Sequence, residues 1–181
     1  MNKKFDFKDL LVLDMANNHQ GDVEHGLNIV RSFAKVVKDR GARAALKFQF
    51  RQLDTFIHQD HHKDSDHKQV QRFLSTRLPW DKFQALLDEV RSQGLVTMCT
   101  PFDEASVDII CDMGFDVIKV ASCSGKDWPL LEKVADADKP VIFSTGGLTP
   151  VSYTHLTLPT NVSRCSSRWS GGEWRGGGGG G

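Results

Sequence analysis

The chain has 181 residues, and its 23 lysines and arginines are balanced by 23 aspartates and glutamates, so it is formally neutral. This balance gives no reason to expect nucleic acid or an anionic membrane surface as a partner. The four cysteines follow no disulfide or zinc-site spacing, the N-terminus does not resemble a signal peptide, and no apolar run is long enough to span a membrane. We therefore expect a cytoplasmic protein with reduced thiols.

Short apolar runs alternate with amphipathic segments along the first 150 residues. The predicted strands are 10–16, 44–50, 96–100, 117–121 and 141–144. The predicted helices are 23–40, 81–92, 104–113 and 129–137, and the first three are each followed by a glycine that would end them. Regular alternation with short links indicates a parallel sheet with right-handed crossovers.

Polar motifs occur where the predicted strands end. NNHQG follows the first strand, KFQ lies in the second, CTPFD ends the third, KVAS closes the fourth and STGG closes the fifth. Polar side chains from the carboxyl ends of successive parallel strands build one site at the mouth of an α/β barrel. We therefore predict an α/β fold, a parallel (β/α)8 TIM-type barrel. It would be truncated after about strand five, because a complete barrel needs roughly 250 residues.

A polar segment, residues 51–78, separates the second predicted strand from the second predicted helix. It contains four histidines, His58, His61, His62 and His67, whose spacing fits no compact zinc site. We interpret this segment as a solvated loop and predict no metal site in it.

The sequence changes character at residue 151. Residues 151–181 show no helical or alternating apolar pattern and end in six glycines. Such a composition cannot bury enough apolar surface to offset the loss of chain entropy. We interpret 151–181 as a disordered or non-native tail and 1–150 as one partial barrel domain.

Two lysines, Lys47 and Lys119, each lie near the end of an otherwise apolar strand. A lysine in such a run is costly unless an anion meets it, so the pair predicts a phosphate or carboxylate site. Each lysine alone could instead extend past the strand end into solvent. Ser122 and Ser144 also end strands beside small residues, where hydroxyls and backbone N–H groups can cradle phosphate oxygens.

Asp14 lies within the first strand, and Asn17 and Asn18 follow it. A carboxylate at a barrel mouth could accept hydrogen bonds from sugar hydroxyls or take part in proton transfer. The asparagines could instead form the turn or cap the next helix. Cys123 has no identifiable base that would make it a nucleophile, so we interpret it as a small buried side chain.

The motifs NNHQGD, KFQ, CTPFDEASVD, IKVAS, PLLEKVA and KPVIFSTGG make residues 10–150 resemble the N-terminal half of the sialic acid synthase family. This family comprises the N-acetylneuraminate, legionaminate and pseudaminate synthases. The resemblance implies a barrel transferase that condenses phosphoenolpyruvate with an N-acetylated hexosamine of the mannosamine type. It also implies Mn²⁺ or Mg²⁺, held by histidines of later strands that are absent from this chain, and a homodimer for the full-length protein.

The resemblance also implies roles for individual residues. Asp14 stands where the family commonly has glutamate and is the candidate catalytic residue, with a shorter side chain. Gln49 and Asn18 match positions that face the sugar. Five residues match positions around phosphoenolpyruvate: Lys47, Thr100, Lys119, Ser122 and Ser144.

Two alternatives stay open. One is another phosphoenolpyruvate- or phosphosugar-using barrel, such as an aldolase or a 3-deoxy-sugar-acid synthase. The other is a truncated reading frame without a function of its own, because an open five-stranded sheet has two unpaired edges. If the family resemblance holds, we still expect this chain to be inactive on its own.

Overall fold

The computed structural model describes residues 5–61 and 66–146. The elements in chain order are β1 (Leu10–Asp14), α1 (Val23–Asp39), β2 (Arg43–Phe50), α2 (Leu53–Phe56), the 3-10 helix η1 (Gln59–His61), α3 (Lys68–Ser75), α4 (Trp80–Ser92), β3 (Val96–Pro101), α5 (Glu104–Asp112), β4 (Val117–Val120), the 3-10 helix η2 (Ser122–Ser124), α6 (Trp128–Asp136) and β5 (Val141–Phe143).

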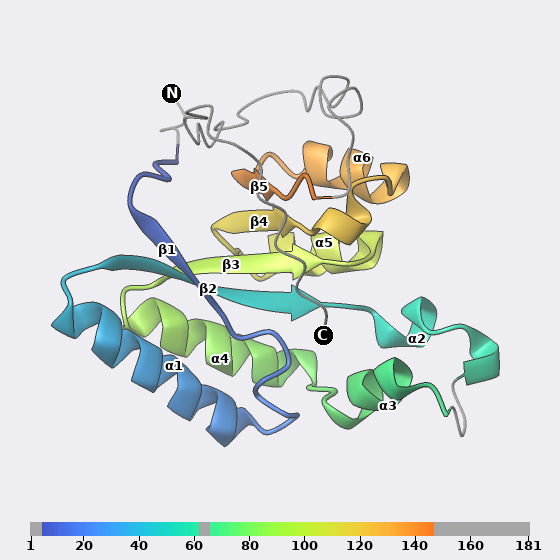
Figure 1. The fold of residues 1–181 in the computed structure, drawn as a ribbon, viewed down its shortest axis with the longest axis horizontal. Helices are drawn as coiled ribbons and strands as arrows, with labels where there is room; N and C mark the ends of the chain where they lie inside the picture. The colour runs from blue at the N-terminus through green and yellow to red at the C-terminus, as the bar shows by residue number, and fades with distance from the viewer. Residues whose placement is uncertain (1–4, 62–65, 147–181) are drawn as a thin grey trace, which may run out of the picture.

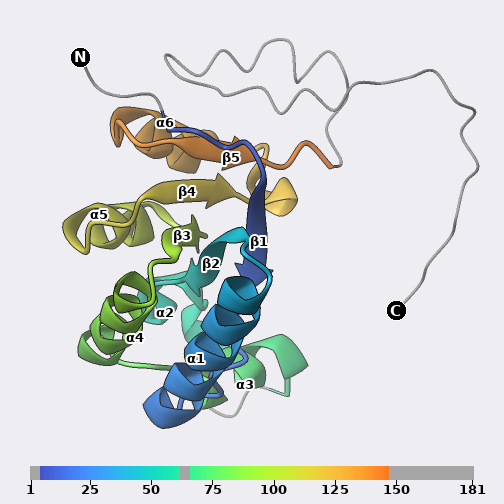
Figure 2. The same ribbon diagram turned by 90° about the vertical axis from the view of Figure 1, so that its left-hand side faces the viewer.

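The five strands form one sheet in the order β1-β2-β3-β4-β5, and every neighbouring pair is parallel. Helices α1, α4, α5 and α6 pack on one side of this sheet (Figure 1 and Figure 2). Strand order that follows chain order, with at least one helix between each pair of successive strands, is the arrangement of a (β/α)8 barrel. The predicted barrel-type fold is therefore confirmed for five strands, which form a half-barrel.

The two faces of the sheet have different surroundings because side chains alternate along a strand. In β2, Leu46, Phe48 and Phe50 belong to the large core beneath the helices. Ala45 instead packs with Met98 and Val117 on the opposite face, which corresponds to the barrel interior. Residues that alternate with Ala45 therefore project toward the interior.

Capping aspartates place the strand-to-helix links. Asp22 accepts the backbone N–H groups of Glu24 and His25 at the start of α1 (2.8 and 3.1 Å). Asp103, from the CTPFD motif, caps α5 by accepting the Ser106 N–H (2.7 Å). Its second oxygen accepts the N–H of Gln52 (2.7 Å), so Asp103 also ties the end of β2 to the end of β3.

The sequence predicted a solvated loop for residues 51–78, and this prediction is wrong. The segment contains the short helices α2, η1 and α3. α3 places Val70, Phe73 and Leu74 at helical spacing, but over only eight residues and within a highly polar segment, so the interpretation as a loop overlooked it. Tertiary contacts supply the missing stabilisation, because the Phe73 ring packs edge-on against Phe56 with 6.2 Å between centroids. His58, His61 and His67 are exposed, whereas His62 lies outside the described residues.

Among residues 5–61 and 66–146, no group of three or more His, Cys, Asp or Glu side chains could hold a metal ion. No helix in the same part of the chain is long and apolar enough to cross a membrane. The predicted domain boundary at residue 150 and the tail 151–181 lie outside the described residues.

Candidate active site at the mouth of the half-barrel

Most of the predicted site residues lie on the interior face of the sheet. Asp14 pairs with Lys47 at the same register position of β1 and β2, and Gln49 pairs with Thr100 between β2 and β3. Lys119 follows the interior residue Val117 by two positions in β4. Strand alternation thus brings these five side chains to one face, near the carboxyl ends of the strands.

The ammonium of Lys47 and the carboxylate of Asp14 form an ion pair, with 2.8 Å between Nζ and Oδ2. The Lys47 side chain is only 10% exposed, whereas the Asp14 side chain is 50% exposed. The Lys47 ammonium is therefore buried at the mouth of the half-barrel, whereas the Asp14 carboxylate remains partly accessible to solvent.

Lys119 is half-buried near the same pair. Burial lowers the pKa of Lys119, and the neighbouring Lys47 ammonium lowers it further, against an opposing effect from Asp14. Two ammonium groups thus share the vicinity of one carboxylate. This local surplus of positive charge is suited to an anionic ligand.

Ser122 can reach the same end of the barrel as Lys119 because β4 ends at Val120 and the chain turns into η2. In a continuing strand, side chains three positions apart would point to opposite faces. Ser144 lies next to this turn, since its N–H donates to the Val120 carbonyl (3.0 Å). A Cβ placed on Gly146 would lie 3.4 Å from the Ser122 Cβ, so the end of β5 approaches Ser122 closely.

The same turn corrects the expectation for Cys123. This side chain is exposed, not buried. The prediction rested on the lack of an identifiable base, which bears on reactivity and not on burial. The 3-10 turn η2 redirects the chain after Ala121 and leaves Cys123 exposed to solvent.

Thr100 is buried, with 1% of its surface exposed. Its hydroxyl has no hydrogen-bond partner among the residues that the structure describes. Leaving a buried hydroxyl unpaired costs free energy. Together with its interior position, this makes Thr100 a candidate ligand-binding residue.

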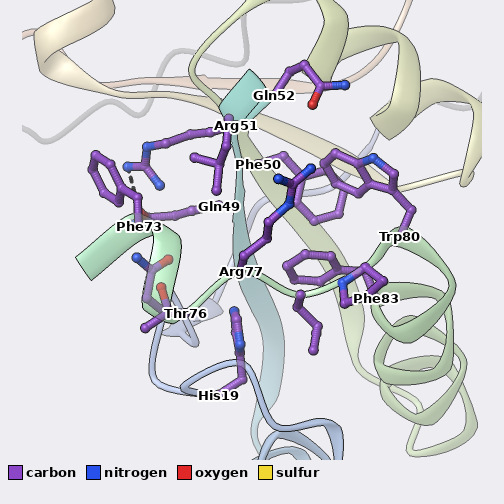
Figure 3. A pocket seen from close by; sticks show the side chains of 14 residues that line it. His19, Gln49, Phe50, Arg51, Gln52, Phe73, Thr76, Arg77, Trp80 and Phe83 are labelled. Atoms are coloured by element: carbon purple, nitrogen blue, oxygen red, sulfur yellow. Dashed lines mark hydrogen bonds between the residues drawn. The ribbon is translucent and has the colours of Figure 1, made fainter. Parts of the chain in front are cut away.

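A cavity of about 310 Å³ lies beside the mouth, at the carboxyl end of β2 (Figure 3). It is bounded by the β1–α1 loop, the residues after β2, α3 and the start of α4. Gln49 lines it as well as the barrel face, so the cavity and the mouth share a wall. Its lining residues are Asn17, His19, Gln49, Phe50, Arg51, Gln52, Leu53, Phe73, Thr76, Arg77, Leu78, Pro79, Trp80 and Phe83.

Asn17, not the predicted Asn18, lines this cavity. Asn18 is exposed in the turn after β1, where its N–H donates to the Met15 carbonyl (2.9 Å). The assignment of Asn18 to the sugar stays a prediction. Arg51 and Phe73 were not singled out from the sequence, because they lie in residues 51–78, the segment that was interpreted as a loop.

His19 forms the base of the cavity and is almost fully buried (2% exposed). Its Nδ1 accepts the backbone N–H of Gly21 (3.1 Å), and its ring lies edge-on to Phe83. Burial lowers the pKa of His19, and nearby His25 lowers it further. The imidazole is therefore neutral near pH 7, with its proton assigned to Nε2 by the hydrogen bond at Nδ1.

The half-barrel with polar side chains at its mouth defines the class as a (β/α)8-type enzyme scaffold, and comparisons with known proteins give the family. A sequence model of the NeuB family matches residues 34–156. The chain therefore belongs to the NeuB family.

Individual relatives agree with this assignment. The crystal structure of a spore coat polysaccharide biosynthesis protein E from Chromobacterium violaceum is 44% identical, with a TM-score of 0.78, over 81% of this chain and 44% of that chain. The N,N'-diacetyllegionaminic acid synthase of Campylobacter jejuni is 27% identical over 77% of this chain and 42% of its own length. An N-acetylneuraminic acid synthetase from Leptospira borgpetersenii shares the fold, with a TM-score of 0.65 at 22% identity, over 81% of this chain and 47% of that chain. The chain thus spans less than half the length of these relatives.

Proposed function

We propose that this chain supplies the phosphoenolpyruvate end of the active site of a nonulosonic acid synthase. The reaction would join phosphoenolpyruvate to an N-acetylmannosamine-type sugar and give a sialic-type acid. The observation that carries the proposal is the convergence of Lys47 and Lys119 beside one carboxylate, Asp14, on the interior face of a NeuB-family half-barrel.

The charges and hydroxyls suggest how the anion would be held. Lys47 already has a partner in Asp14, so the Lys119 ammonium is the one that an incoming phosphate or carboxylate would neutralise. The unpaired Thr100 hydroxyl can donate to the same ligand. Ser122 and Ser144, which follow the neighbouring strands β4 and β5, can add hydroxyl and backbone donors.

In the proposed reaction, C3 of phosphoenolpyruvate bonds to the aldehyde carbon of the sugar, and water adds at C2 before phosphate leaves. The lysines would offset the negative charge that develops on the phosphoenolpyruvate fragment. Asp14, half exposed at the mouth, could accept hydrogen bonds from the sugar or take up a proton.

The family resemblance implies Mn²⁺ or Mg²⁺, which would polarise the aldehyde when bound. In the part of the chain that the structure describes, no cluster of side chains fits such an ion. Asp14 is engaged with Lys47, and Nδ1 of His19 with Gly21. We therefore assign no step to a metal held by these residues.

Calorimetric titration of the chain with phosphoenolpyruvate tests the proposal. Lys119→Met keeps the aliphatic stem and removes the charge, so binding should weaken about tenfold to a hundredfold, as expected for one charge-assisted contact. Lys38→Met, at the exposed end of α1, is the matched control and should bind like the wild type. Equal affinity for Lys119→Met and wild type, or no binding to either, would reject the proposal.

A second candidate is a Schiff-base aldolase, which the lowered pKa of Lys119 favours, because a neutral amine is the nucleophile in imine formation. In that case the amine would condense with pyruvate, water would leave, and borohydride would reduce the imine to a stable adduct. The synthase proposal predicts no pyruvate adduct by mass spectrometry after borohydride treatment. An adduct on the wild type that is lost in Lys119→Met would favour the aldolase.

A further inference from the structure

Gln49 and Arg51 are joined by a hydrogen bond at the end of β2. Nη2 of Arg51 donates to Oε1 of Gln49 (3.2 Å), and Figure 3 shows this bond on one side of the cavity. Residues two apart in an extended segment project from the same face, which brings the two side chains within reach of each other. The bond is charge-assisted, because an arginine stays protonated near pH 7 although burial lowers the pKa of Arg51.

Arg51 decides which way round the Gln49 amide lies. A guanidinium carries only donors, so the amide atom that faces it must be the carbonyl oxygen. The NH₂ group then points elsewhere, and no residue in the ranges 5–61 and 66–146 accepts from it. It is not among the buried polar atoms that are sealed from water. Because Gln49 lines the cavity and pairs with Thr100 across the sheet, a free donor stands where the cavity meets the mouth.

Two aromatic rings hold the guanidinium of Arg51. Its central carbon lies 3.7 Å from the centroid of Phe102 and 4.5 Å from the centroid of Phe73. The rings come from separate segments, the end of β3 and helix α3. Such contacts stabilise the charge and restrict the orientation of the guanidinium plane. The Nε–H is sealed from water without a partner among the described residues, so Arg51 cannot hold a ligand through this atom.

The CTPFD motif fixes the Phe102 ring relative to β2. The Phe102 N–H donates to the Phe50 carbonyl (3.1 Å), and the next residue, Asp103, accepts the N–H of Gln52 (2.7 Å). The two bonds involve the residues on either side of Arg51. The segment that stacks on the arginine side chain is therefore also tied to the backbone next to it. This gives the motif a task besides capping α5.

A glutamine without such support would bind a ligand less well. Its side chain has three rotatable bonds, and its amide can turn over and present either the oxygen or the NH₂ group. Ordering a side chain of this kind on binding opposes affinity. Where Arg51 holds Oε1, the side chain is already ordered in the folded chain. The positive charge on Oε1 also polarises the amide, which makes its NH₂ group a stronger donor.

We infer that Arg51 is a positioning residue, which acts on the ligand through Gln49. Held by Phe102 and Phe73, it fixes the amide so that the Gln49 NH₂ group donates to an oxygen of the ligand. Under the proposed function this ligand is the acceptor sugar, and the contacted atom is an uncharged hydroxyl or carbonyl oxygen. The identity of the ligand rests on the proposed function, whereas the positioning of Gln49 by Arg51 does not.

The mobility of the Gln49 amide tests the positioning without any ligand. In the ¹⁵N-labelled chain, Gln49→Glu identifies the side-chain NH₂ resonances by their loss, and ¹⁵N relaxation measures their mobility. In the wild type this group should be as rigid as the β2 backbone, whereas the exposed Gln59 should be mobile. Arg51→Met should make the Gln49 NH₂ group mobile. Arg77→Met, which changes a cavity arginine paired with Asp54 (3.0 and 2.8 Å), is the matched control and should leave it rigid.

A second variant separates the aromatic contacts from the hydrogen bond. Phe102→Leu keeps both partners of the bond but removes one ring, so the Gln49 NH₂ group should again become mobile. Phe5→Leu removes a contact with a different arginine, Arg43 (5.4 Å), and should change nothing at Gln49. Circular dichroism and the β2 backbone resonances establish that each variant is folded.

Three results would contradict the positioning. A mobile Gln49 amide in the wild type overturns it, and this measurement needs no variant in order to fold. An amide that stays rigid in Arg51→Met overturns it as well. An amide that stays rigid only in Phe102→Leu overturns the part assigned to Phe102.

Titration tests the ligand. N-acetylmannosamine would be added to the chain saturated with phosphoenolpyruvate, and we expect the Gln49 NH₂ protons to move downfield. Arg51→Met should weaken sugar binding about two- to tenfold, as expected for the ordering of one glutamine side chain. Binding of phosphoenolpyruvate through Lys119 should not change. A role of Arg51 in folding alone would weaken the binding of both substrates.

The outcomes separate this inference from the proposed function. If phosphoenolpyruvate binds and the sugar leaves the Gln49 NH₂ protons unmoved, the sugar is the wrong ligand and the proposed function stands. If phosphoenolpyruvate itself shifts these protons, the donor serves that substrate and the assignment to the sugar is overturned. If Arg51 holds the amide rigid while phosphoenolpyruvate binds nowhere, the proposed function fails together with the assignment of the ligand, and the positioning role stands.

Discussion

Lys47 and Asp14 face each other at the same register position of β2 and β1, with 2.8 Å between their charged atoms. The lysine side chain is 10% exposed and the aspartate side chain 50%. One ion pair therefore joins a buried ammonium to a carboxylate that water still reaches. Because the two side chains differ in burial, removing one charge should cost a different amount of stability from removing the other.

We expect Asp14→Asn to destabilise the chain more than Lys47→Met. Removing Asp14 leaves a buried ammonium without its counter-ion, a loss of about 1–3 kcal/mol in the free energy of unfolding. Removing the Lys47 charge leaves a carboxylate that solvent can hydrate, so the cost should be below about 1 kcal/mol. Urea unfolding measures both. A larger loss for Lys47→Met would show that the lysine does more than pair with Asp14.

The burial of His19 predicts a pH-dependent stability. Its pKa in the folded chain is lowered from 6.5 by burial and by His25, whereas the unfolded chain keeps the ordinary value. As the pH falls through 6.5, the unfolded state binds a proton that the folded state excludes. The free energy of unfolding should therefore fall, until the pH reaches the folded-state pKa. Urea unfolding at pH 7.5 and 5.5 measures this loss.

The matched comparison for this prediction uses two histidine variants. In His19→Gln, the free energy of unfolding should fall less between pH 7.5 and pH 5.5 than in the wild type, whatever the variant's stability at pH 7.5. His58→Gln, which changes an exposed histidine, should keep the wild-type decrease. An unchanged decrease in His19→Gln would show that other groups cause it.

Gly21 and Gly41 both have a left-handed backbone conformation, but only Gly21 lies close to other residues. Comparing their alanine variants therefore separates the cost of a steric contact from the cost of the backbone conformation. Gly21 has φ +76°, and a Cβ there would lie 3.3 Å from the carbonyl oxygens of both Ser75 and Arg77. Gly41 has φ +59° and open space around it. Gly41→Ala should cost about 1–2 kcal/mol for the backbone conformation alone. Gly21→Ala should cost more, because the β1–α1 loop must also move away from the end of α3.

This difference can be read from urea unfolding of the two variants. When Trp80 is replaced by fluorotryptophan, its ¹⁹F signal should also shift in Gly21→Ala. The β1–α1 loop and residues 76–77, which this variant displaces, line the same cavity as Trp80. Equal losses of stability without a change at Trp80 would contradict the close contact between the β1–α1 loop and residues 75–77.

We expect the 181-residue chain to show no synthase turnover on its own. Its five described strands form a half-barrel, and Leu11 and Val12 on the two faces of β1 remain exposed. Stabilisation of a transition state requires a preorganised site that excludes water. Phosphate release from phosphoenolpyruvate, in the presence of an N-acetylhexosamine and Mn²⁺, would measure this. Retained phosphoenolpyruvate binding is the control for folding, and turnover at an ordinary enzymatic rate would contradict the expectation.

The local pattern of apolar residues was sufficient to predict the strands and most of the helices. The helical and strand periodicities depend only on residues that are close together in the sequence. The predicted strand 44–50 corresponds to β2, and the predicted helix 81–92 to α4, each within one residue. Alternation also places Lys47 and Gln49 on the face opposite Phe48. Lys47 was proposed because a lysine near the end of an apolar strand needs an anion, and Gln49 because the family resemblance implied it. The roles proposed for those residues stay predictions.

The sequence by itself therefore determined the alternating elements, the parallel half-barrel and the set of polar side chains at its mouth. Only the tertiary structure decided that Lys47 pairs with Asp14, that Cys123 is exposed, and that residues 51–78 fold into short helices beside a cavity. These features depend on contacts between residues far apart in the chain, such as Arg51 between Phe73 and Phe102. No local periodicity encodes such contacts, because their free energy appears only when separate segments meet.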